Sequence, residues 1–138
     1  MAQYELMASF AGFDDFLIYL SIASALLMVF IAIYLRITPY REISLIRDGN
    51  TAAAFSLSGT IIGMVLPLAS ALQYSVGLVD LLVWATIALA VQIIVFVVAR
   101  IALPNIVHDI PAGKQASGIF LGAISIAAGM LNAAAMTY

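Results

Sequence analysis

Four apolar stretches dominate this sequence and restrict what it can fold into. They cover residues 16–35, 52–72, 81–102 and 116–136, and the one charged residue inside them, Arg100, lies near the end of the third. A helix needs roughly 20 apolar residues to cross the hydrocarbon core of a bilayer. Because lipid offers no partner for backbone N–H and C=O groups, each stretch is predicted to be a helix. The fold is therefore predicted to be an all-α integral membrane protein with four transmembrane helices.

Composition supports the same class and excludes others. Hydrophobic residues make up 65% of the 138 positions and charged residues 9%, whereas about 25% charged residues are usual in soluble domains. A small soluble domain cannot hide so much apolar surface, so the lipid bilayer is the predicted partner. A net charge of -2 argues against nucleic acid. The absence of cysteine excludes thiolate metal sites and cysteine nucleophiles.

The charged residues predict how the chain is oriented. Residues 1–5 lack the basic start of a signal peptide, so the first stretch is expected to be a retained span. Every basic residue lies in one of two connections, between the first and second spans or between the third and fourth: Arg36, Arg41, Arg47, Arg100 and Lys114. Cytoplasmic loops collect Lys and Arg. Both connections are therefore predicted to face the cytoplasm, with both termini and the middle loop outside.

The two halves of the chain match at an offset of 64 positions. Arg36 corresponds to Arg100, and Gly49 corresponds to Gly113. We interpret this pattern as two tandem helix hairpins, residues 1–72 and 73–138. Since each has two spans, both enter the membrane in the same direction, as a parallel repeat. Parallel repeats suit bundles and rings better than alternating access.

The second and fourth spans are rich in small residues, and both contain GxxxG. The glycines predicted to mediate close helix packing are Gly59, Gly63, Gly118, Gly122 and Gly129. These two spans are expected to form the protein-facing interior, with the bulkier first and third spans facing lipid. Four helices make a thin bundle, so a homo-oligomer is also expected. Pro67 predicts a kink in the second span, either a packing bend or a gating hinge.

A small set of polar side chains within the spans forms the candidate pore or cavity lining: Ser56, Ser58, Thr60, Ser70, Gln92 and Asn132. Such groups either line a path or hold helices together through hydrogen bonds. The Gln92 amide in particular needs a partner that lipid cannot supply. Asp14 and Asp15, before the first span, either complement its helix dipole or form an acidic ring at an outer mouth.

The inner connections are candidates for contact with headgroups or with another protein. Arg36 and Arg100 are placed to snorkel to anionic headgroups. Residues 41–50 have apolar positions at helical spacing, which favours a short interfacial helix ended by Gly49. Arg41, Arg47, Asn50 and Lys114 are the candidate docking residues in these connections.

No catalytic constellation is present in the sequence. It contains no Ser-His-Asp set, no buried carboxylate pair and no Gly-rich phosphate loop. The single histidine, His108, is weak support for a metal site. We therefore expect no enzyme activity, no metal and no cofactor.

Several segments resemble one bacterial family. They are residues 37–42, 45–54, 58–59, 116–122 and 129–138, including GNTAAA (49–54) and NAAAMT (132–137). These segments are similar to the "domain of unknown function 350" family of YjfL-like inner-membrane proteins, over nearly the whole chain. The resemblance implies a small multi-pass protein of the bacterial inner (plasma) membrane, built on a doubled hairpin, with no established catalytic residues. Asn50 and Asn132 are the motif positions to test first.

Two functional hypotheses follow. The first is an oligomeric channel or transport protein for ions or small solutes, based on the parallel repeat and the small polar stripes. The second is a membrane scaffold or stress-response subunit that docks a cytoplasmic partner through its basic inner loops. An accessory subunit of a larger membrane complex is a third possibility.

Overall fold

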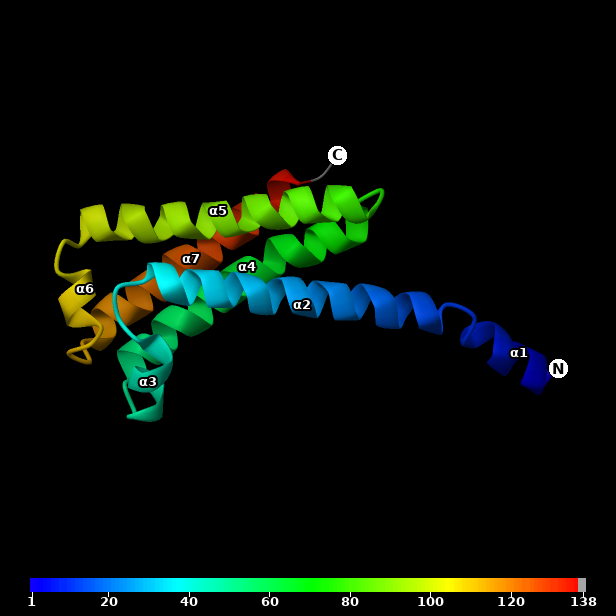
Figure 1. The fold of residues 1–138 in the computed structure, drawn as a ribbon, viewed down its shortest axis with the longest axis horizontal. Coiled ribbons are helices and arrows are strands. Elements are labelled where there is room, and N and C mark those ends of the chain that lie inside the picture. Colours follow the sequence, from blue (N-terminus) through cyan, green and yellow to red (C-terminus); the bar gives the residue numbers. More distant parts are fainter. Residues whose placement is uncertain (137–138) are drawn as a thin grey trace.

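The computed structural model describes residues 1–136. Four long helices carry the fold: α2 (Phe13–Ile37), α4 (Thr51–Tyr74), α5 (Leu78–Ala102) and α7 (Gln115–Ala135). Three short helices join or precede them: α1 (Ala2–Ser9), α3 (Glu42–Arg47) and α6 (Ile106–Asp109) (Figure 1). Thr137 and Tyr138, which end the segment 129–138, lie outside the described residues.

The structure confirms the predicted all-α fold with four membrane-spanning helices. Each long helix is apolar and long enough to cross a bilayer, and α1 and α2 together form the first candidate span. The helix α1 was not predicted. The helix α2 also begins earlier than predicted and takes Asp14 and Asp15 into its first turn, where carboxylates complement the helix dipole.

The closest helix contact joins α4 to α7. A Cβ atom added at Gly59 would lie 2.3 Å from the Gly122 Cα, and one at Gly118 would lie 2.2 Å from the Ala52 carbonyl oxygen. These distances leave no room for a side chain, so the two backbones touch. Two of the four long helices are thus held together by van der Waals contact along glycine-rich faces.

The four long helices differ in how much of each is buried by the rest of the chain. In its most apolar stretch α4 is 56% buried, whereas α5 is 33%, α7 28% and α2 11% buried. The expected contrast between an interior fourth span and a lipid-facing third span stays a prediction: one face of α7 packs on α4, while Ile119, Phe120 and Leu131 are exposed. Residues 1–21 are exposed throughout, and α1 with the first half of α2 extends away from the other helices (Figure 1).

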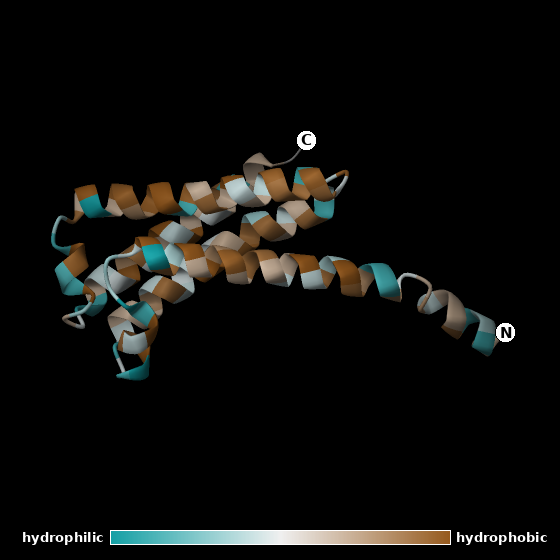
Figure 2. Cartoon of the chain, viewed as in Figure 1, coloured by the Kyte–Doolittle hydropathy of each residue, from teal (hydrophilic) through white to brown (hydrophobic). Residues whose placement is uncertain are grey.

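The long helices are apolar along most of their length, and the hydrophilic residues lie mainly in the connections between them. Figure 2 shows apolar residues along most of α2 and α5, with hydrophilic residues concentrated at the connections and the N-terminal end. In the core, the rings of Tyr34 and Phe96 meet edge to face with centroids 6.1 Å apart. Apolar surfaces of this extent, with no protein partner in the single chain, match a lipid environment.

At one end of the bundle, two short helices return the chain to the next span. Gly49 and Gly113 follow them with φ of 87° and 81°, a left-handed conformation that favours glycine. The helices α3 and α4 begin 64 positions before α6 and α7, at Glu42 against Ile106 and Thr51 against Gln115. The tandem repeat itself stays a prediction.

The second span remains helical through Pro67. Proline has no N–H, so the Gly63 carbonyl loses its helical donor. That carbonyl faces α7, where a Cβ at Gly129 would lie 2.3 Å from it. The kink predicted at Pro67 stays a prediction.

Candidate functional site

A row of polar side chains lies buried between the spans. Ser56 and Thr60 are four residues apart on α4 and so share one face. Tyr34 comes from α2 and Gln92 from α5, and all four side chains are at most 1% exposed. We call these four residues, with the buried Ser125 of α7, the polar row.

Hydrogen bonds link part of the row. The Thr60 hydroxyl lies 3.1 Å from the Ser56 carbonyl oxygen, to which it donates, and 3.4 Å from the Tyr34 hydroxyl. The Gln92 amide donates to the Ser125 carbonyl oxygen at 3.1 Å. Within the described chain, the Ser56 hydroxyl and the Gln92 amide oxygen have no hydrogen-bond partner. Unsatisfied polar groups are costly inside a membrane protein, which marks this row as a candidate functional feature.

The row continues at the α3/α6 end with Tyr40 and Glu42. Glu42 is 1% exposed and Tyr40 8% exposed. Glu42 begins α3, which packs against α4, and Tyr40 lies in the α2–α3 connection just before it. The Tyr40 hydroxyl lies beside Glu42 and Ser56. Burial raises the pKa of the Glu42 carboxyl to about 8, against a smaller lowering by the Tyr40 hydroxyl. Burial and the Glu42 charge together raise the pKa of the Tyr40 phenol, which stays protonated.

Sequence reasoning missed Tyr34, Tyr40, Glu42 and Ser125. Glu42 falls in the segment 41–50, for which the sequence predicted only a short interfacial helix. Glu42 stands directly after exposed Arg41, so its local sequence resembles an ordinary water-facing segment. The one local signal was the i, i+4 spacing of Ser56 and Thr60, which points to a polar face on α4.

The structure separates the six predicted lining residues. Ser56, Thr60 and Gln92 belong to the polar row. Ser58 is exposed and borders a groove between α4 and α7. At the opposite end from α3, the Ser70 hydroxyl donates to the Ala133 carbonyl oxygen at 3.1 Å, and the neighbouring Asn132 is half-buried.

Asn50 joins the α3–α4 connection to the α6–α7 connection. Its side-chain oxygen accepts a hydrogen bond from the Ala53 N–H at 2.9 Å and so caps α4. Its side-chain nitrogen lies 2.8 Å from the Ile110 carbonyl oxygen and 3.2 Å from that of Pro111. A hydrogen bond of 2.9 Å from the Gln115 side-chain nitrogen to the Thr51 hydroxyl joins the starts of α7 and α4.

The basic side chains gather at the α3/α6 end. Arg36, Arg41, Arg47 and Arg100 are exposed. Lys114 is also exposed and lies 3.3 Å from Asp109, whose carboxylate accepts a hydrogen bond from Ser117 as well. Contact of these side chains with lipid headgroups stays a prediction.

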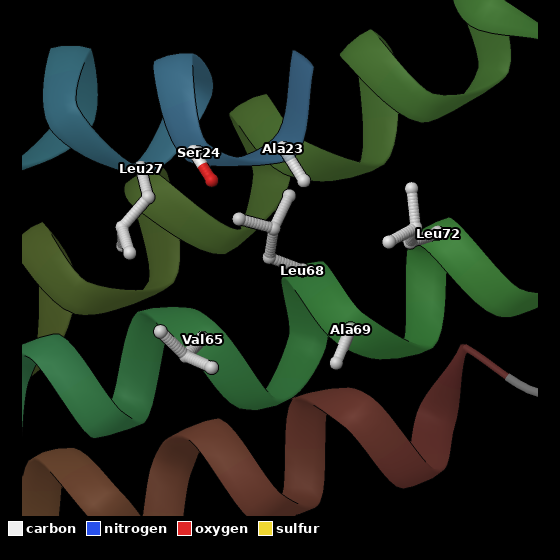
Figure 3. Close-up of a pocket in the computed structure, with 7 residues that line it drawn as sticks. All are labelled: Ala23, Ser24, Leu27, Val65, Leu68, Ala69 and Leu72. Atoms are coloured by element: carbon white, nitrogen blue, oxygen red, sulfur yellow. The ribbon is translucent and has the colours of Figure 1, made fainter. Parts of the chain in front are cut away.

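An apolar groove lies between the middle of α2 and the second half of α4. It encloses about 190 Å³ and is shown in Figure 3. Its lining residues are Ala23, Ser24, Leu27, Val65, Leu68, Ala69 and Leu72. Such a surface accommodates an acyl chain or another apolar helix rather than a polar solute. Among residues 1–136, no three His, Cys, Asp or Glu side chains lie close enough to hold a metal ion together.

Comparisons with known proteins place this architecture in a family. The family described as Domain of Unknown Function (DUF350) matches residues 6–136. Two relatives, each named UPF0719 inner membrane protein YjfL, come from Escherichia coli strain K12 and Escherichia coli O157:H7. Each is 40% identical over 120 residues, which cover 87% of this chain and 91% of the relative. No solved structure matches the chain. The family match and the identity to these relatives together show that the chain belongs to the DUF350 family.

Proposed function

We propose that this protein is a homo-oligomeric channel or transporter of the bacterial inner membrane that moves a small cation or solute along the polar row. The observation that carries the proposal is the burial of Ser56, Thr60 and Gln92 among α2, α4, α5 and α7. Polar groups in transmembrane interiors are expensive, and those that persist mark ion and proton pathways. Our proposal assigns no catalysis to the chain.

The packing of α4 supports a path on the α2 and α5 side. Its opposite face meets α7 backbone to backbone at Gly59 and Gly63, which excludes a solute there. Residues 13–21, at the start of α2, are exposed in the described structure. We propose that displacement of α2 from α4 opens the row, and that other copies or lipid cover the outer half of α2.

Orientation and location are also part of the proposal. The two relatives are named as inner membrane proteins, and we extend that location to this chain. All five basic residues lie at the α3/α6 end, which the positive-inside rule assigns to the cytoplasm. Both termini are then outside.

A flux assay with matched threonine variants tests the transport proposal. Thr60→Val and Thr86→Val each remove a hydroxyl that donates to the carbonyl four residues earlier. Thr60 is buried in the row, whereas Thr86 is exposed. In liposomes, wild-type protein should conduct cations above empty vesicles. Thr60→Val should reduce the rate at least about tenfold, equivalent to roughly 1.4 kcal/mol, and Thr86→Val should leave it unchanged.

Two results would contradict the proposal. One is wild-type flux no greater than that of empty vesicles at any applied potential. The other is equal flux through the Thr60→Val and Thr86→Val proteins, which would separate transport from the polar row.

The second candidate function, a scaffold for a cytoplasmic partner, is favoured by the exposure of Arg36, Arg41, Arg47 and Arg100 at one end. It predicts that Arg41→Glu with Arg47→Glu abolishes crosslinking to a cytoplasmic protein in cells and preserves the oligomer. Crosslinks to copies of the same chain alone would eliminate this function.

A further inference from the structure

Glu42 is a buried carboxylate without a cationic partner. Its side chain is 1% exposed, and neither carboxylate oxygen has hydrogen-bonding geometry with another group of the described chain. The nearby Arg41 and Arg47 are exposed, and no ion pair joins either of them to Glu42 within residues 1–136. A carboxylate removed from water must be neutralised by a proton or by a bound cation.

The groups around Glu42 supply further oxygens. The hydroxyls of Tyr40 and Ser56 are also buried and make no hydrogen bond of regular geometry in the described structure. The Tyr40 hydroxyl nevertheless lies close to Ser56 and Glu42. Tyr34 lies near enough to Glu42 for their side chains to interact electrostatically, and its hydroxyl meets Thr60 at 3.4 Å. The cluster therefore combines one formal negative charge with several neutral oxygens.

This combination selects a class of ligand. Oxygen donors suit hard cations, but Ca²⁺ takes six to eight oxygen ligands with carboxylates prominent among them. A single carboxylate balances one positive charge. We propose that Glu42, Tyr40 and Ser56 form a binding site for one alkali-metal cation, which a proton displaces at lower pH.

The position of the site gives it a role. It lies at the α3/α6 end of the polar row and shares Ser56 with the row. In this respect the inference rests on the proposed function, since it names the cation class and the inner entry of the transport path. Binding itself is measurable without transport, so the two ideas can fail separately.

Proton competition follows from the surroundings of Glu42. Tyr34 from α2 and Tyr40 from the α2–α3 connection are the titratable groups that interact with it, and exposed Arg41 lines the same groove. The α4 side chain beside Tyr40 is the Ser56 hydroxyl. Burial and the Glu42 charge raise the pKa of the Tyr40 phenol, so Tyr40 stays neutral while Glu42 changes charge near pH 8. Cation binding should therefore strengthen as pH rises from 6 to 9.

The test uses the full chain purified in mild detergent. Calorimetric titrations with sodium chloride and potassium chloride, against choline chloride at equal ionic strength, report binding at pH 6 and pH 9. We expect saturable binding of Na⁺ or K⁺ at pH 9, at least tenfold weaker at pH 6, and a higher unfolding temperature in the bound state. Glu42→Gln should abolish binding, and Tyr40→Phe and Ser56→Ala should each weaken it.

Asp48→Asn is the matched control, because Asp48 is an exposed carboxylate that directly follows α3. It should bind like the wild type. Heats for Na⁺ and K⁺ equal to those for choline would overturn the site, and so would unchanged binding by Glu42→Gln together with Tyr40→Phe. Cation binding without liposome flux would support the site and contradict the transport function. Flux without cation binding would support transport and contradict the site.

Discussion

The buried position of Glu42 disfavours the charged form of its carboxyl group. Its pKa rises to about 8 from an ordinary value of 4.5 because burial penalises the charged form. Between these values the folded chain binds more protons than the unfolded chain, so stability falls as pH rises. Since one pKa unit is worth about 1.4 kcal/mol, the loss is on the order of 5 kcal/mol at most.

The prediction is a stability profile in choline chloride, where no alkali cation offsets the charge. The unfolding temperature of the wild type in detergent should fall as pH is raised from 5 to 9, with most of the change complete just above pH 8. Glu42→Gln should flatten the profile. A wild-type profile that rises with pH over this range would contradict the burial of Glu42.

Asn50 stabilises the α3/α6 end of the bundle through hydrogen bonds that its motif position did not reveal. It caps α4 through Ala53 and donates to carbonyls of Ile110 and Pro111. Asn50→Ala should cost about 1–3 kcal/mol, from the lost cap and the carbonyls left unpaired. Asn105→Ala is the control, because Asn105 precedes α6 and makes no side-chain capping bond. Denaturant titration in detergent should separate the two variants.

At the scale of elements, the α4–α7 contact depends on the absence of side chains. Alanine at Gly59 would gain about 1 kcal/mol in helix propensity. Its Cβ would lie 2.3–2.6 Å from backbone atoms of Gly122, however, and backbone cannot rotate away. Forcing the helices apart costs typically 1–3 kcal/mol and sometimes more, so the clash outweighs the propensity gain.

Gly59→Ala should therefore lower the unfolding temperature of the protein in detergent. Gly12→Ala should leave it nearly unchanged, because Gly12 has no neighbour within 4 Å of an added Cβ and has a negative φ. Equal stability of the two variants would show that α4 and α7 are further apart than the structure places them.

At the scale of the whole molecule, the orientation in the membrane can be measured directly. The chain has no cysteine, so single cysteines report position without background. Val76→Cys lies in the α4–α5 connection, where Val76 is 96% exposed, and Ser44→Cys lies on the exposed side of α3. In intact spheroplasts, a membrane-impermeant maleimide should label the first variant and reach the second only after permeabilisation. The reverse pattern would invert the proposed orientation.

The sequence by itself determined the four spans and the fold class. Span length and apolar composition are local properties, so they can be read without knowing which helix meets which. Part of the polar row was accessible in the same way, because Ser56, Thr60 and Gln92 are polar residues within apolar spans.

Only the tertiary structure decided that Glu42 and Tyr40 are buried and that Ser58, Ser70 and Asn132 lie apart from the row. Burial of Glu42 depends on the packing of α3 against α4. The sequence of neither segment by itself shows that the two are in contact. The physical reason is that transfer into lipid depends on the composition of one segment, whereas enclosure of a side chain depends on the surfaces that other segments bring to it.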